Sequence, residues 1–163
     1  ISLFAPLKYA KVSFCLYQSA KNSRDNEIKS RNNISINATK ITSLKDIKTS
    51  GVKLIGIDEA HMFDEKDVFM LEKILKNGID LIISGLDTDY RGKMFPIIKK
   101  IMEMSPSKII YKKAVCENCK NINAGYTQVL KNGKPVLNKI KSAIPEDGTY
   151  FYKPVCRNCF IKK

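Results

Sequence analysis

The sequence predicts an α/β fold with a mainly parallel sheet flanked by helices, followed by a small C-terminal zinc-binding lobe. Two runs, at residues 52–57 and 81–84, are apolar at nearly every position and do not alternate with polar residues. Such continuous runs are typical of parallel strands that are covered on both faces. A segment with helical periodicity separates these runs, which favours a parallel connection. Two Cys-x2-Cys pairs near the C-terminus predict the lobe.

The N-terminal part of the chain contains short strand signals around a polar stretch. Ser43 is a good N-cap for a short helix that reaches residue 48. The other predicted elements are strands at 1–4 and 12–17, a loop at 18–33, and weaker strands at 34–36 and 38–41.

The central part alternates strand and helix. After the strand at 52–57, a helix opens at Asp64 or Glu65 and ends before Gly78, since apolar residues recur with helical spacing. Beyond it we predict a strand at 81–84, a helix at 96–104 and a strand at 108–115. The α/β domain is therefore expected to span residues 1–115 and the zinc lobe residues 116–163.

The composition limits the classes of function. No apolar run reaches the roughly 18–20 residues of a membrane helix, and the N-terminus lacks a secretory signature. We therefore expect a soluble, cytoplasmic protein with no membrane partner. The net charge of +13 comes mostly from Lys spread along a chain that is also rich in Ile and Asn. An AT-rich coding sequence produces the same pattern, so a nucleic-acid partner is not favoured, whereas phosphate-bearing substrates suit the positive field.

The paired cysteines predict a metal site. Cys116, Cys119, Cys156 and Cys159 can present four thiolates from two tight turns, which is a tetrahedral zinc site. A filled thiolate shell leaves no position for water, so the zinc would be structural. The alternatives are two disulfides or free thiols, and a reducing setting disfavours disulfides. Cys15, in an apolar stretch, is expected to be a small buried hydrophobe.

Two adjacent carboxylates, Asp58 and Glu59, follow the strand at 52–57. Ligands bind at this edge of open α/β sheets, where one carboxylate can hold Mg²⁺ and the other accept a proton. The alternative is a solvated acidic turn before a helix, where the helix dipole favours negative charge. These two residues alone do not distinguish a catalytic pair from such a turn. The letters Asp58-Glu59-Ala60-His61 match a helicase box, but the second motor lobe that helicases need is missing.

Several further motifs resemble the type II thymidine kinases. Residues 85–95, GLDTDYRGKMF, resemble the family's GLDxDFRGxPF segment, and residues 57–63 its DExQFF box. Residues 125–128 and 132–135 are similar to its YT[KQ]R and NGKP motifs, and residues 152–159 to its Yxx[VR]CRxC. The resemblance runs, in the family's order, from about residue 52 to the end.

This resemblance implies a P-loop, RecA-like fold and an ATP-dependent kinase of nucleotide salvage. The family transfers the γ-phosphoryl of ATP to the 5′-hydroxyl of thymidine, and usually of deoxyuridine. By resemblance, Glu59 is the general base and Asp58 the Mg²⁺-linked carboxylate. The nucleoside contacts it implies are Met62, Leu86, Tyr90, Thr127 and Tyr152.

The resemblance implies further properties. By resemblance, Arg91 is expected to lie near the phosphates. The alternative is that it forms a surface salt bridge. His61 replaces the family's usual Gln and is expected to form hydrogen bonds in the box rather than to catalyse. A homotetramer and feedback inhibition by thymidine triphosphate are also expected.

One departure concerns the phosphate loop. No Gly-x4-Gly-Lys-Ser/Thr occurs in the sequence, although residues 4–6 resemble the lead-in to that loop. Independently, residues 5–11 are too few for a crossover between parallel strands at 1–4 and 12–17. We therefore expect a loop and most of a helix to be missing after about Pro6. Without that loop, the alternative is a non-catalytic, zinc-lobed protein that binds nucleotides or nucleic acid.

Overall fold

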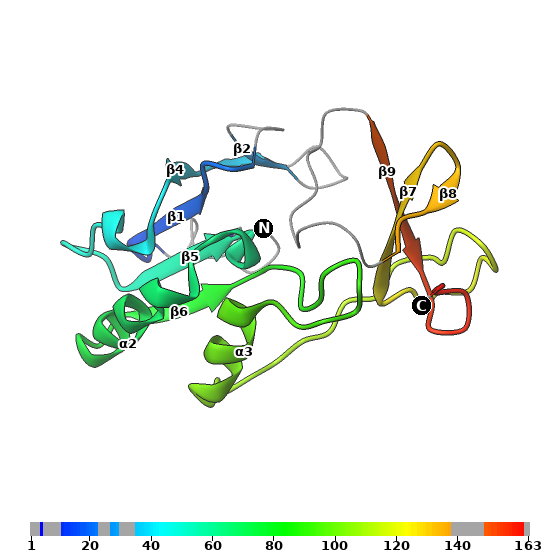
Figure 1. Ribbon diagram of the computed structural model, residues 1–163. Helices are drawn as coiled ribbons and strands as arrows, with labels where there is room; N and C mark the ends of the chain where they lie inside the picture. Colours follow the sequence, from blue (N-terminus) through cyan, green and yellow to red (C-terminus); the bar gives the residue numbers. More distant parts are fainter. Residues whose placement is uncertain (1–3, 5–10, 23–26, 30–34, 138–148, 162–163) are drawn as a thin grey trace. The chain divides into compact units, whose positions relative to one another are not determined.

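A parallel sheet is the frame of the first part of the chain. The computed structural model describes residues 4, 11–22, 27–29, 35–137 and 149–161 (Figure 1). The chain divides into two units, one of residues 1–86 with 96–105 and the other of 87–95 with 106–163. The predicted boundary at residue 115 differs from this division, because residues 87–95 and 106–115 group with the cysteine-bearing part.

The sheet of the first unit has the strand order β4-β1-β5-β6, and all neighbours are parallel. Its strands are β1 (Phe14–Ser19), β4 (Thr39–Ile41), β5 (Leu54–Asp58) and β6 (Asp80–Ile83). The predicted parallel sheet is thus confirmed. However, β1 continues through Gln18 and Ser19, which the sequence had placed in a loop. Both are about 1% exposed, so burial by neighbouring strands outweighs their polarity.

The strands bury side chains on both faces, as parallel strands do. Alternate residues such as Tyr17, Ile55 and Ile57 pack in the main core with the helices. The intervening residues Leu16 and Leu54 pack in a second cluster with Phe4 and Ile36. Cys15 is partly buried against the main core, close to the expected environment.

Gly56, in the middle of β5, is required by close packing. A Cβ atom there would lie 2.3 Å from a methyl carbon of Leu16 and 2.4 Å from the ring of Phe4. The missing side chain therefore lets the second cluster close over the sheet.

Helices cover the main core. Helix α2 (Val68–Lys76) follows the short 3₁₀ turn η3 (Glu65–Asp67) and ends before Gly78, whose φ of +72° suits a glycine. Helix α3 (Pro96–Glu103) places Ile97 in the core. Both helices were predicted at these positions.

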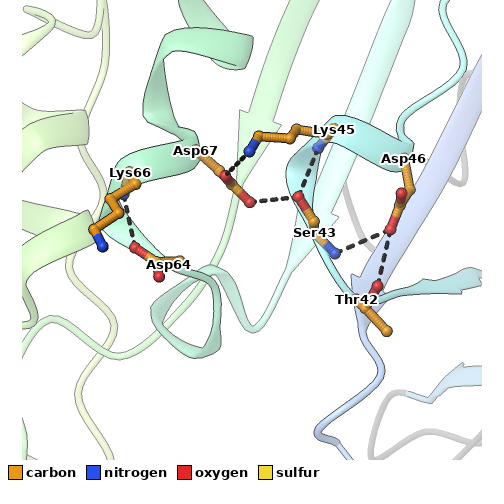
Figure 2. Close-up of polar contacts among 7 residues, drawn as sticks. All are labelled: Thr42, Ser43, Lys45, Asp46, Asp64, Lys66 and Asp67. Atoms are coloured by element: carbon orange, nitrogen blue, oxygen red, sulfur yellow. Dashed lines mark hydrogen bonds and ion pairs between the residues drawn. The ribbon is translucent and has the colours of Figure 1, made fainter.

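The predicted helix from Ser43 is a single 3₁₀ turn, η1 (Leu44–Asp46), closed by a capping box between Ser43 and Asp46. Figure 2 shows how this turn is tied to the start of α2: the Ser43 hydroxyl donates to the Asp67 carboxylate at 2.5 Å. The Lys45 ammonium lies 3.5 Å from the same carboxylate. The turn is short because Ile47 is already extended and buried.

A small antiparallel pair, β2 (Glu27–Lys29) with β3 (Ser35–Asn37), occupies part of the predicted polar loop and the weak strand signal after it. Of the predicted N-terminal strand, the structure describes Phe4. The expected junction after about Pro6 lies outside the described residues.

The second unit contains an antiparallel sheet in the order β8-β7-β9. Its strands are β7 (Tyr126–Lys131), β8 (Lys134–Pro135) and β9 (Tyr150–Val155). Asn132 and Gly133 both have positive φ and join β7 to β8, as expected of an Asn-Gly hairpin turn.

The strand predicted at 108–115 is wrong. These residues form a single bridge, between Ala114 and Ala124, and Ile109, Ile110 and Tyr111 are about half exposed or more. An apolar run shows that a segment can be extended, but a strand also needs a neighbour with free backbone groups.

Candidate active site and metal centre

Asp58 is the last residue of β5 and is held by the end of the neighbouring strand. The Ser84 hydroxyl donates to one oxygen of its carboxylate at 2.5 Å. Backbone bonds fix the same junction, since Ser84 N–H donates to Ile57 and Ala60 N–H donates to Ser84, both at 2.9 Å. Sequence reasoning missed Ser84. Its place at the end of a predicted strand, beside the strand that carries Asp58, was the signal that could have found it.

Glu59 has a left-handed backbone, with φ 53° and ψ 40°, directly before the 3₁₀ turn η2 (Ala60–Met62). This conformation is uncommon for a residue with a side chain and is concentrated at functional sites. The Met62 N–H donates to the Glu59 carbonyl at 2.9 Å. The turn therefore gives the Glu59 backbone one defined position at the edge of the sheet.

His61, in η2, is buried beside Glu59. Its Nδ1 accepts a hydrogen bond from the Leu86 N–H at 3.1 Å and lies 3.4 Å from Oε2 of Glu59. Burial lowers the pKa of His61 to about 4, although the charge of Asp58 acts in the opposite direction. The imidazole is therefore neutral near pH 7, and its contact with Glu59 is not an ion pair. His61 therefore forms a hydrogen bond, as expected, but its partner Leu86 lies outside residues 57–63. Its bonding within the box and its non-catalytic role stay predictions.

The segment after β6 lies tightly against η2. A Cβ atom on Gly85 would lie 3.2 Å from the backbone nitrogens of Ala60 and His61. Leu86, which follows, exposes 48% of its surface. The first unit thus brings Asp58, Glu59 and Leu86 to one edge of the sheet, with Met62 in the same turn as His61.

Asp89 organises the turn at 87–95 in the second unit. It is 5% exposed and accepts hydrogen bonds from the N–H groups of Arg91 and Lys93. The Arg91 guanidinium pairs with the other Asp89 oxygen at 2.6–2.7 Å. Arg91 therefore forms a salt bridge, as in the alternative, but with a buried carboxylate rather than at the surface. Its role near phosphates stays a prediction. Sequence reasoning missed Asp89, although Asp followed three residues later by Gly92 is typical of a type I turn.

The other predicted nucleoside contacts also lie in the second unit. Tyr90 is 6% exposed. Thr127 on β7 pairs with Pro154, and Tyr152 on β9 pairs with Val129. Because directly opposed residues share a face and alternate residues of a strand do too, Thr127 and Tyr152 lie on the same face of this sheet.

The four predicted metal ligands come together in the second unit. The sulfur atoms of Cys116, Cys119, Cys156 and Cys159 lie within 4.8 Å of one another, and all four cysteines are free. The sulfurs of Cys119 and Cys156 are 3.7 Å apart. A disulfide needs about 2.05 Å, whereas a tetrahedral zinc–thiolate site with bonds of about 2.3 Å has sulfurs about 3.8 Å apart.

Backbone groups prepare this cluster for a cation. The Cys156 N–H donates to the Cys116 sulfur at 3.3 Å. Hydrogen bonds from the backbone of Cys119, Cys156 and Asn118 lower the pKa of the Cys116 thiol to about 6. Contacts with the neighbouring thiols, above all Cys156, raise the pKa of Cys159 to about 12. One thiolate forms readily, and a bound cation such as zinc would stabilise the remaining thiolates.

Among the residues that the structure describes, no helix has both the length and the apolar character needed to span a membrane.

Comparisons with known proteins agree on one family. The family model described as thymidine kinase matches residues 1–160. A thymidine kinase of Mycoplasma mycoides subsp. mycoides is 33% identical over 168 aligned positions, which cover 95% of this chain and 78% of the relative. A thymidine kinase of Bacteroides thetaiotaomicron is 29% identical, with 95% of this chain and 75% of the relative covered. The chain belongs to the thymidine kinase family.

Proposed function

We propose that this protein is a thymidine kinase that transfers the γ-phosphoryl of ATP to the 5′-hydroxyl of thymidine, with deoxyuridine as a further acceptor. The observation that carries the proposal is the carboxylate pair at the end of β5, in a chain that belongs to this family. Asp58 is fixed by Ser84, and Glu59 by its left-handed turn.

The two carboxylates have different roles in this proposal. Glu59 accepts the proton of the 5′-hydroxyl as the oxygen attacks phosphorus. Asp58 would hold the Mg²⁺ that accompanies ATP, since a carboxylate oxygen is a ligand that Mg²⁺ prefers. When bound, Mg²⁺ neutralises charge on the phosphates. The hydroxyl of Ser84 orients Asp58 for this task.

The nucleoside contacts implied by the resemblance fall in both units. Met62 and Leu86 belong to the first, and Tyr90, Thr127 and Tyr152 to the second. Apolar and aromatic side chains suit a flat, methylated pyrimidine. The exposure of Leu86 and the shared face of Thr127 and Tyr152 support this assignment.

We propose a structural Zn²⁺ held by Cys116, Cys119, Cys156 and Cys159. The sulfur separations fit a tetrahedral thiolate site, and the four side chains leave no ligand position for substrate. The ion would hold together the two turns that flank the β7–β9 sheet.

A phosphate-binding loop is needed for the reaction. We propose that it belongs after about Pro6, where the crossover is too short. By resemblance, we also propose a homotetramer and feedback inhibition by thymidine triphosphate.

Replacement of Glu59 by Gln tests the proposed function. In the protein with its complete phosphate loop, wild type should phosphorylate thymidine with ATP and Mg²⁺. Glu59→Gln should lower kcat by about 10²–10⁴-fold, because the general base is lost. Zinc content should not change, since the cysteines lie in the other unit.

Glu103→Gln is the matched control, because Glu103 is exposed on α3 and its contact with Lys99 is a 3.9 Å surface pair. It should keep wild-type activity. A natural gene that lacks the Gly-rich loop, or a wild type with zinc but no kinase activity, would favour the non-catalytic binding protein instead.

A further inference from the structure

His61 connects the two segments of the first unit that the proposed function uses. It lies two residues after Glu59, and its imidazole Nδ1 binds the backbone N–H of Leu86, 25 residues further along the chain. The side chain is only 7% exposed. His61 is also the single histidine of the chain.

The hydrogen bond from Leu86 fixes the protonation pattern of the ring. A neutral imidazole has one acceptor nitrogen and one donor nitrogen. Nδ1 accepts from Leu86 at 3.1 Å, so the proton is on Nε2. Gly85 packs closely against the same turn, since a Cβ atom on it would lie 3.2 Å from the backbone nitrogens of Ala60 and His61. This packing also keeps the two segments together.

The same ring nitrogen also lies close to the Glu59 side chain: Nδ1 is 3.4 Å from Oε2 of the carboxylate. Since Nδ1 carries no proton in this tautomer, it does not tie the carboxylate in an ion pair. The ring instead occupies space beside the carboxylate. Together with the left-handed backbone of Glu59, it restricts where the carboxylate can lie.

We propose that His61 is a positioning residue: one imidazole nitrogen holds the backbone of Leu86, and the bulk of the ring limits where the carboxylate of Glu59 can lie. The general base and one wall of the nucleoside site are thereby kept in a single arrangement. This inference rests on the proposed function for the roles of Glu59 and Leu86. His61 is not itself a proton carrier to substrate, because it is almost fully buried.

The ring tautomer is the first test and needs no activity. In protein labelled with ¹⁵N-histidine, His61 gives the only imidazole signals. At pH 7 we expect the ¹⁵N shifts of an Nε2–H tautomer, with Nδ1 unprotonated and hydrogen-bonded. A signal from an Nδ1–H tautomer or from a charged ring would overturn the proposal.

Three variants then separate positioning from folding. His61→Asn places an amide oxygen where Nδ1 lies, His61→Gln extends the amide by one methylene, and His61→Leu fills the space without an acceptor. In the protein with its complete phosphate loop, we expect His61→Leu to lower kcat and raise KM for thymidine, with kcat/KM falling roughly 10- to 100-fold. His61→Asn should regain most of this loss, and His61→Gln less.

Asp64→Ala is the control for stability. Asp64 caps the turn η3 by accepting from the Lys66 N–H at 2.9 Å. The variant should lower Tm but leave kcat and KM unchanged. If His61→Leu behaves like this control, with a changed Tm but wild-type kcat and KM, then His61 is only a core residue and the proposal is overturned.

The two possible failures are distinct. A wild type that does not phosphorylate thymidine contradicts the proposed function, while the ¹⁵N tautomer still decides whether Leu86 and His61 are joined. An active wild type with an equally active His61→Leu variant contradicts the positioning role and leaves the proposed function standing.

Discussion

Glu59 and His61 define the site at the scale of single residues. The left-handed backbone of Glu59 costs about 1–2 kcal/mol relative to the right-handed form, so surrounding contacts must hold it. The Met62 N–H and the short connection to Ser84 through Ala60 are among these contacts. In the proposed function, this conformation places the proposed base at the carboxyl end of a parallel strand, where ligands bind in open α/β sheets.

Acidification should destabilise the protein through His61. Its pKa is about 4 in the folded state and about 6.5 in the unfolded chain, so between these values the unfolded chain binds more protons. The stability contributed by the neutral ring is present above about pH 6.5 and is lost as pH falls toward 4. The full loss is on the order of 3 kcal/mol.

Urea unfolding of wild type and His61→Asn between pH 7 and pH 4 measures this effect. The difference in unfolding free energy between the two should shift with pH, because Asn does not titrate. Parallel pH profiles of the two proteins would contradict the assignment of a depressed pKa to His61.

At the scale of elements, the contact between η1 and the start of α2 joins segments that are separate in sequence (Figure 2). Ser43 serves both as the N-cap of η1 and as a donor to Asp67, which is 6% exposed. The Ser43 hydrogen bond is the main cause of the lowered pKa of Asp67, and Lys45 adds to it. One serine therefore fixes the turn and anchors it to α2.

Ser43→Ala should destabilise the first unit by about 1.5–3 kcal/mol, as expected for loss of a hydrogen bond to a charged group. The Asp67 pKa is lowered in the folded state, so this contribution is present above about pH 4 and is lost as pH falls through the folded pKa. Chemical unfolding at pH 7 and pH 3 measures the change.

A double-mutant cycle with Asp67→Asn isolates the pair, and Ser50→Ala, at an exposed serine of the same segment, is the control. The two single changes should not be additive. Additive effects, or an equal cost of Ser43→Ala at both pH values, would show that Ser43 acts through the turn alone.

At the scale of the whole molecule, the two units rely on different sources of stability. The first has a core on both faces of its sheet. The second has a small cluster in which two of the four buried residues, Cys116 and Cys156, are themselves proposed metal ligands. With so little buried apolar surface, this unit is expected to depend on the proposed ion that would join its cysteines.

Removal of zinc should therefore unfold the second unit and spare the first. Hydrogen exchange after chelation should show loss of protection in β7 and β9 but continued protection in β5, which lies in the independent core. Cys15→Ala, which changes the fifth cysteine, should leave zinc content and exchange unchanged. Protected β7 and β9 amides in metal-free protein would refute the dependence on zinc.

Much of this fold could be predicted, because the signals are local. The strands β5 and β6, helices α2 and α3 and the Asn-Gly turn each follow from the composition of a few consecutive residues. The expected burial is found for β5, whereas β6, at the edge of the sheet, is only partly buried. The strand predicted at 108–115 fails because an apolar run does not specify a partner. The helix predicted from Ser43 shrinks to a turn because Ile47 is drawn into the core.

By itself, the sequence determined the parallel sheet, the four clustered cysteines and the placement of Asp58 and Glu59 at the end of β5. Short spacings and strand order carry this information. The tertiary structure alone decided the contacts of Ser84 with Asp58, of His61 with Leu86, of Ser43 with Asp67, and of Arg91 with Asp89. Except for Arg91 with Asp89, these pairs join residues more than 20 positions apart, and the geometry of the folded chain sets which side chains meet. For Arg91 and Asp89, two positions apart, the burial of the aspartate decides that it takes the guanidinium as its partner.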